Sequence, residues 1–128
     1  MSVLFASADR APATYNAEIY LSPDAGGALF YINYTAEGGG SSVLDAKLQY
    51  WDASEQAWDD LTDSAGNAIA FAQFTGVSED SLKVYPGLTE KITLTNRQYN
   101  APLPRRLRLQ AVVGTTNVTF SAGFENLL

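Results

Sequence analysis

The sequence predicts an all-β fold: an antiparallel β-sandwich, of the jelly-roll or immunoglobulin-like type, with about seven or eight strands. Short segments in which apolar and polar side chains alternate recur along most of the 128 residues, and this period of two is typical of half-buried strands. Clusters of Gly, Pro, Asp, Asn and Ser separate the segments. All five prolines lie outside the predicted strands, where the missing backbone N–H costs no hydrogen bond of a sheet.

The composition limits the kinds of partner that this chain is expected to bind. A chain of this length fits one domain. The formal charge of −6, from 8 basic and 14 acidic residues, argues against phosphate-dominated binding, which needs basic surface, so we expect no nucleic-acid partner. No apolar run approaches the roughly 20 residues of a membrane span, and the first residues lack the basic segment of a signal peptide. We therefore expect no membrane partner.

The chain contains no cysteine and no histidine. Their absence excludes a thiol nucleophile, a Cys/His zinc site and a Ser-His-Asp triad. A glycosidase would need two carboxylates about 5–10 Å apart across a cleft, and a sandwich this small leaves little room for one. We therefore expect neither an enzyme nor a bound cofactor.

Apolar–polar patterns in the N-terminal half of the chain predict an arm followed by the first two strands. Residues 1–15 have no clear periodicity and are predicted to form an extended N-terminal arm, with the β-sandwich domain in residues 16–128. The first strand is predicted at 17–22, where apolar and polar residues alternate. Residues 28–36 are apolar or aromatic at both parities, which predicts a central strand covered on both faces.

A hairpin is predicted in the middle of the chain. Residues 43–52 place their apolar side chains on one face, and residues 57–63 follow after a loop of about four or five residues. Residues 68–76 predict a further strand, although their alanines are weak strand formers and leave a helical turn open.

The segment "SLKVYPGLTEKITLT" (residues 81–95) has an alternating stretch on each side of a Pro-Gly pair. Proline fixes φ at the second position of a turn and glycine accepts a positive φ at the third, so the pair predicts a type II turn between two strands. An irregular crossing follows, and the last two strands are predicted at 105–113 and 118–128.

Acidic side chains cluster after the predicted hairpin. Ca²⁺ prefers several converging oxygen ligands, so the cluster is a candidate calcium site. Its spacing differs from that of the helix-loop-helix calcium motif, and Asp-rich turns are common as solvated hairpin ends, which is the favoured interpretation. The candidate ligands are Asp59, Asp60, Asp63 and Asn67.

Aromatic residues gather near the same hairpin. Exposed Trp and Tyr rings on a β-sandwich can stack on sugars, and this makes Tyr50, Trp51 and Trp58 a candidate sugar-binding site, with Tyr99 as a further aromatic. The alternative is that Trp51 and Trp58 pack against each other across two strands and stabilise the sheet. The flanking positions of the two tryptophans favour cross-strand packing.

Three of the five arginines lie in the segment "PRRLRLQ". Arg106 and Arg108 share the outward parity of a predicted strand, so they are candidates for contact with acidic side chains of a partner or a second subunit. Pairing with the chain's own surplus of acids is an equally good interpretation.

Several segments, taken together and in order, resemble a family of small virion proteins of tailed bacteriophages that are encoded among head genes. The resemblance covers nearly the whole chain. It rests on an Ala-Ser-Ala-x-Arg start, a strand that ends in Thr-Ala, a Gln-x-Trp-Asp strand end, a Val-Tyr-Pro-Gly turn, a Leu-Pro-Arg strand and a Val-Thr-Phe-Ser strand. The segments are "VLFASADRAPATYNAEIYL", "ALFYINYTA", "KLQYWDASEQAWDDL", "LKVYPGL" and "LPRRLRLQAVVGTTNVTFSAGFENLL".

The resemblance implies a capsid decoration or cement protein, a non-enzymatic component made in the host cytoplasm and located on the outside of the virion head. Its expected partners are the major capsid protein and itself, as a homotrimer. Val3, Leu4 and Phe5 of the arm would contact the shell, with Arg10 as a charged anchor, unless the terminus is disordered. The alternatives are a carbohydrate-binding or host-adhesion module on the virion, and a tail or head–tail junction component.

Overall fold

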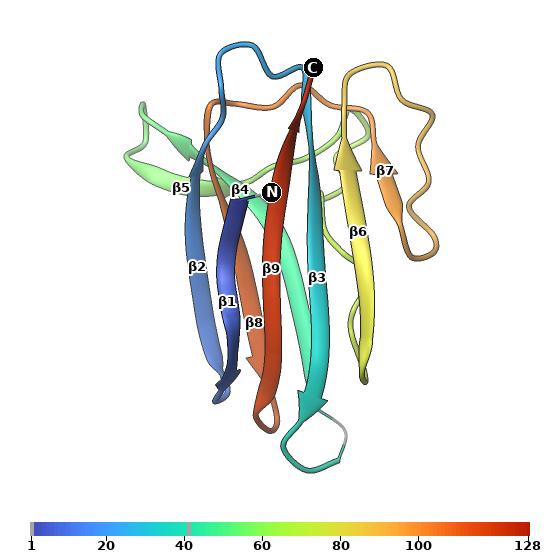
Figure 1. Ribbon diagram of the computed structural model, residues 1–128. Coiled ribbons are helices and arrows are strands. Elements are labelled where there is room, and N and C mark those ends of the chain that lie inside the picture. Colours follow the sequence, from blue (N-terminus) through green and yellow to red (C-terminus); the bar gives the residue numbers. More distant parts are fainter. Residues whose placement is uncertain (1, 41) are drawn as a thin grey trace.

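The computed structural model describes residues 2–40 and 42–128 and confirms the all-β class. Within these ranges the chain forms nine strands in two sheets and no helix (Figure 1). None of this part of the chain could therefore cross a membrane as a helix. The strands are β1 (Ser2–Arg10), β2 (Ala13–Tyr20), β3 (Gly27–Glu37), β4 (Val43–Asp52), β5 (Ala57–Asp60), β6 (Ser78–Val84), β7 (Arg97–Tyr99), β8 (Arg106–Gly114) and β9 (Val118–Leu127).

The strand order identifies the sandwich as a jelly roll. One sheet has the order β1-β9-β3-β6-β7, and the other has the order β2-β8-β4-β5. The main antiparallel pairs nest inside one another along the chain: β1 with β9, β2 with β8, β3 with β6, and β4 with β5. This nesting across two sheets is the double Greek-key arrangement. The short β7 adds a parallel neighbour to β6 at one edge.

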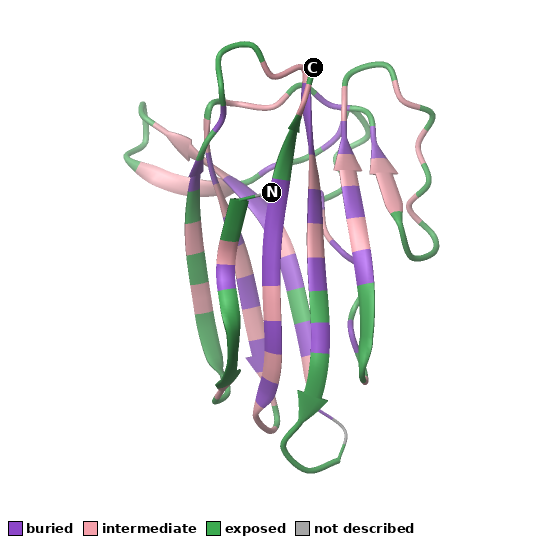
Figure 2. Cartoon of the chain, in the orientation of Figure 1, coloured by how far each residue is buried: buried purple, intermediate pink, exposed green. Residues whose placement is uncertain are grey.

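The core lies between the two sheets, and the strands alternate toward it as the sequence predicts. On β8 the buried residues Leu107, Leu109, Ala111 and Val113 alternate with half-buried outward ones. Figure 2 shows the same banding on β9 and β3. Each large apolar side chain taken from water into this layer contributes about 1.5–3 kcal/mol.

The expected N-terminal arm is wrong as a description of this segment. Residues 2–10 form β1, which pairs antiparallel with β9 at the edge of a sheet, and β2 begins at Ala13, inside the range assigned to the arm. The register between β1 and β9 shifts between Val3 and Phe5 and again between Phe5 and Ala8. These irregularities interrupt the period of two, which is why the sequence shows no strand pattern there.

β3 is central in its sheet, between β9 and β6, but only one of its faces is buried. On the outer face Leu29 and Tyr31 are half-buried, and Asn33 and Thr35 are exposed (Figure 2). The prediction of a strand covered on both faces was therefore wrong. Each sheet of a sandwich has one face toward solvent, and β3 carries Leu29 and the aromatic Tyr31 there without being covered.

Residues 68–76 do not form a regular strand or a helical turn. They run alongside β4 beyond the end of β5 and make isolated bridges, Lys47 with Ala70 and Leu44 with Phe74. Ile69, Phe71 and Phe74 are buried. The segment thus closes the edge of its sheet through side-chain burial and a few backbone hydrogen bonds.

The Pro-Gly turn forms as predicted, but the strand after it does not. The Leu88 N–H donates to the Tyr85 carbonyl at 3.3 Å, and Gly87 has φ of +90°, as a type II turn requires. Residues 91–95 make only one isolated bridge, and Leu94 is 72% exposed. The edge of β6 instead pairs with β7, and residues 91–95 meet β7 only at Lys91, which exchanges two backbone hydrogen bonds with Gln98.

Candidate interaction surface

The outer face of the four-stranded sheet carries a cluster that we call the arginine–tryptophan face. Its members come from four strands, and strand alternation directs all of them away from the core. Trp51 of β4 and Trp58 of β5 are paired residues of the hairpin, with ring centroids 5.5 Å apart and planes at 65°. The predicted cross-strand packing is confirmed. The face consists of Tyr20, Trp51, Trp58, Arg106 and Arg108.

Arg106 lies over the aromatic rings. Its guanidinium carbon is 4.7 Å from the Trp51 ring centroid and 5.2 Å from that of Trp58, which is within cation–π range. Its Nη2 contacts Glu18 Oε1 at 3.3 Å, an ion pair whose side chains are 37% and 45% exposed. Its Nε is the one buried side-chain nitrogen or oxygen among the described residues that has no hydrogen-bond partner. The rings, rather than the weak surface ion pair, hold this side chain.

Arg108 is fixed by a hydrogen-bonded row across β8, β4 and β5. Its guanidinium carbon is 4.6 Å from the Trp58 centroid, and its Nε donates to Gln49 Oε1 at 2.7 Å. Gln49 Nε2 donates in turn to Asp60 Oδ1 at 2.9 Å, and Lys47 Nζ lies 2.9 Å from the same oxygen. Burial lowers the pKa of Arg108, and Glu18 raises it in part. The row therefore fixes the Arg108 side chain on this face within the chain itself.

The opposite side of the β4–β5 hairpin is acidic, and we call it the acidic face. The carboxylates of Asp52, Glu55 and Asp59 have oxygens within 4.8 Å of one another. Asp59 is paired with Tyr50, so both lie on the side of the hairpin away from the tryptophans. Burial raises the pKa of the Tyr50 hydroxyl, and so do the charges of these three acids. Together the four residues make up the acidic face.

The structure does not bring the candidate calcium ligands together. Asp60 belongs to the row beneath Arg108, whereas Asp59 faces the other way. Asp63 accepts hydrogen bonds from the backbone N–H groups of Ala65 and Asn67 and from the Asn67 amide. Burial alone would raise the pKa of Asp63, but these hydrogen bonds hold it below its usual range. Asp63 therefore fastens a turn.

The candidate sugar-binding residues are divided between two surfaces. Tyr50 pairs with the buried Leu107 and packs against the core, on the face opposite to Trp51 and Trp58. Tyr99 is 1% exposed. The two tryptophans remain half-buried at the surface, with a guanidinium over their rings.

The candidate shell contacts on β1 have different environments. Val3 is exposed, and Leu4 is half-buried. Phe5 is in the core with its ring edge-to-face against Phe120, centroids 5.4 Å apart. Arg10 lies 4.5 Å from the Phe120 centroid and donates to the carbonyls of Phe120 and Ala6 at 2.8 and 2.7 Å. Arg10 thus clamps β1 onto β9, and contact with a shell stays a prediction for all four residues.

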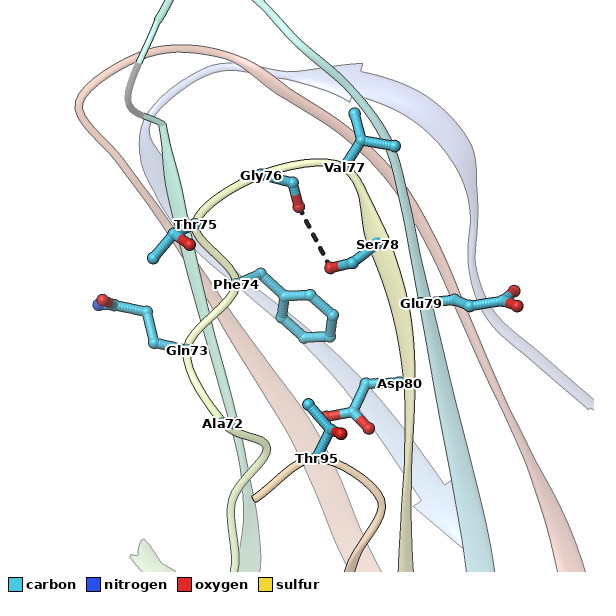
Figure 3. Close-up of a pocket in the computed structure, with 10 residues that line it drawn as sticks. All are labelled: Ala72, Gln73, Phe74, Thr75, Gly76, Val77, Ser78, Glu79, Asp80 and Thr95. Atoms are coloured by element: carbon cyan, nitrogen blue, oxygen red, sulfur yellow. Dashed lines mark hydrogen bonds between the residues drawn. The ribbon is translucent and has the colours of Figure 1, made fainter. Parts of the chain in front are cut away.

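An open depression of about 250 Å³ lies beside the start of β6, and Figure 3 shows the side chains that line it. Within it the Ser78 hydroxyl donates to the Gly76 carbonyl at 3.2 Å. Asp80 is buried, and its Oδ1 accepts from the N–H groups of Ser81 and Asn96 at 2.8 and 2.6 Å. The carboxylate is therefore occupied in fastening the loop, and no base–nucleophile pair converges there.

The sequence patterns indicate the two tryptophans and the two arginines as separate candidates. They do not indicate that the arginines lie over the tryptophan rings. They also do not indicate Tyr20, Glu18 and Gln49 as neighbours of the arginines. The signal for each was outward parity on its own strand, but which strands are neighbours does not follow from periodicity.

No family model matches this chain, and no curated protein matches it. Among the solved structures, the chain is similar to part of a chain in the structure of infectious bursal disease virus, Gx strain. The two are 12% identical with a TM-score of 0.41, over 95% of this chain and 30% of the viral chain. The present chain thus spans about a third of the length of that protein, and likeness at this level says nothing about function.

Proposed function

We propose that the protein is a non-enzymatic structural component of a tailed-phage virion: a capsid decoration protein that binds the major capsid protein and associates with itself as a homotrimer. The observation that carries the proposal is the arginine–tryptophan face, a preordered and partly exposed cluster of the residue types that dominate protein–protein contacts. Its hydrogen-bonded row lowers the entropy cost of binding, because the side chains are already ordered.

The sequence resemblance supports the choice of a virion rather than another assembly, because it extends over almost the whole chain. The jelly-roll fold agrees with it by analogy only, since viral capsid and lectin domains both use that fold. The expected location is the outer surface of the head, after synthesis in the host cytoplasm.

A host-adhesion module is the competing proposal, and a specific observation bears on it. Stacking of a sugar needs an open ring face, and the two half-buried tryptophans are the candidates. The Arg106 guanidinium lies over both rings, so a sugar would have to displace it or use the remaining ring surface. The arrangement favours a protein partner over a sugar.

Immunogold electron microscopy of purified virions, with an antibody against this chain, tests the proposal. Gold over the whole head surface supports decoration. Gold confined to the tail or the head–tail junction moves the protein there, and virions without gold contradict a virion role. Glycan binding that is lost in Trp51→Ala and Trp58→Ala, with folding retained, would favour the adhesion module.

A further inference from the structure

The surface around the β4–β5 hairpin carries unlike charges on its two sides, with arginines of the adjacent strand β8 on one side and carboxylates of the hairpin on the other, and we propose that this region joins successive copies of this chain head to tail. In this contact the arginine–tryptophan face of one copy docks against the acidic face of the next. The inference rests on the self-association in the proposed function and names the surfaces that would mediate it.

The hairpin projects from the side of the sandwich, as Figure 1 shows for the green strands β4 and β5. Register fixes which side chains share a face: Trp51 opposes Trp58, and Tyr50 opposes Asp59. The tryptophans and arginines therefore point one way and the three carboxylates the other. Both sides of the projecting β4–β5 hairpin can therefore contact other molecules.

Charge complementarity identifies a second copy as the occupant. Arg106 Nη2 donates to Glu18, and Arg108 Nε donates to Gln49. Other guanidinium N–H groups of both arginines have no protein partner among the described residues. Asp52, Glu55 and Asp59 have carboxylate oxygens within 4.8 Å of one another, and burial together with their charges raises the pKa of Tyr50. The Ser54 hydroxyl and the N–H groups of Ser54 and Glu55 already donate to Asp52 Oδ1 and hold the pKa of Asp52 below its usual range. The carboxylates of Glu55 and Asp59 are therefore the ones that an arginine pair from a neighbour would engage through bidentate, charge-assisted hydrogen bonds.

The opposite direction of the two faces determines the type of symmetry. A two-fold contact would bring like faces together, arginines against arginines, which costs energy. A head-to-tail contact brings unlike faces together in every copy, and such a heterologous contact gives a ring when its rotation closes and an open filament when it does not. The trimer of the proposed function is one such ring.

Charge reversal with rescue tests the contact on the full chain, with mass measured by light scattering after size exclusion. Arg106→Glu with Arg108→Glu, and separately Glu55→Lys with Asp59→Lys, should each weaken association at least tenfold. All four changes in one chain should restore the oligomer, because the charges are again complementary. Lys91→Glu, an exposed reversal away from the hairpin, is the matched control and should not change the mass.

A wild-type monomer at all concentrations, unchanged mass in both reversals, or a folded fourfold variant that stays monomeric would each overturn the inference. Calcium bound by the wild-type monomer and lost in Glu55→Lys with Asp59→Lys would also overturn it by assigning the acidic face to a cation. Virion labelling is independent of these results, so the proposed function can stand when the head-to-tail contact fails.

A second measurement does not require a charge-reversed variant to fold. Arg108→Lys keeps the charge and supplies an amine that a carbodiimide can couple to a carboxylate. With a mixture of isotopically labelled and unlabelled chains, mass spectrometry should find links from position 108 to Glu55 or Asp59 between chains. Links found only within one chain would contradict the contact.

Discussion

Phe120 is the residue on which the N-terminal strand depends. Its ring is buried, meets Phe5 edge-to-face and lies beneath the Arg10 guanidinium. One side chain therefore joins hydrophobic packing, an aromatic pair and a cation–π contact.

Phe120→Ala should lower the free energy of unfolding by about 3–5 kcal/mol, because it leaves a cavity and removes both ring contacts. Urea denaturation followed by circular dichroism measures the change. Val3→Ala, at a position 71% exposed on the edge strand β1 that packs against Phe120, is the control and should stay within about 0.5 kcal/mol. Equal effects of the two changes would refute this account of β1.

Asp60 makes the row beneath Arg108 sensitive to pH. Hydrogen bonds from Gln49 and Lys47, and the Lys47 charge, hold its pKa below the usual range. A folded-state pKa below the unfolded one stabilises the protein above the unfolded pKa, about 4, and this stability is lost as the pH falls through the folded pKa. Wild type should therefore lose more stability than Asp60→Asn between pH 5 and pH 3 in urea titrations. Parallel losses would show that the row does not respond to this carboxylate.

At the level of elements, strands with regular alternation were predictable, and those with an irregular register were not. β8 and β9 follow the period of two, and the Trp51–Trp58 pair follows from the loop length of the hairpin. β1 was missed because its bulged register hides the pattern. Apolar and polar residues alternate over 91–95, yet this segment does not form a strand. Alternation specifies which side chains would share a face, but it does not supply a neighbouring strand to pair with.

The β6–β7 connection depends on one glycine. Gly87 has φ of +90°, and the space that a Cβ would occupy there is open, so Gly87→Ala should cost about 1–2 kcal/mol from backbone strain alone. Gly76→Ala, where space is also open and no positive φ is needed, should cost less than about 0.5 kcal/mol. Thermal unfolding of both variants measures the difference, and equal midpoints would contradict the turn assignment.

Removal of residues 2–10 should destabilise the whole sandwich rather than trim a flexible arm. The deletion removes Phe5 from the core, removes the Arg10 clamp and exposes the edge of β9. We expect a loss of at least about 3 kcal/mol in urea denaturation, since a buried Phe alone contributes that much. A deletion variant with wild-type stability would restore the interpretation of this segment as an arm.

At the scale of the whole molecule, the arginine–tryptophan face was beyond prediction because it depends on non-local pairing. Arg108 meets Gln49 only because β8 lies beside β4. The fold class follows from local patterns, whereas the candidate surface follows from strand order, which those patterns do not specify.

Association through the two faces should weaken with salt. The screening length falls from about 10 Å at 0.1 M to about 3 Å at 1 M ionic strength, so the mass measured by light scattering should decrease as NaCl is raised. Circular dichroism across the same series controls for unfolding. A mass that is constant or rises with salt would indicate apolar association instead.

The nesting of the strands has a consequence for synthesis on the ribosome. Because β1 pairs with β9 and β2 with β8, the two earlier strands must wait for β8 and β9 to leave the exit tunnel. Until then the apolar side chains of the N-terminal half have no sheet to complete, which favours slow folding and exposure to chaperones. A sandwich built in this way closes only after β9 has emerged.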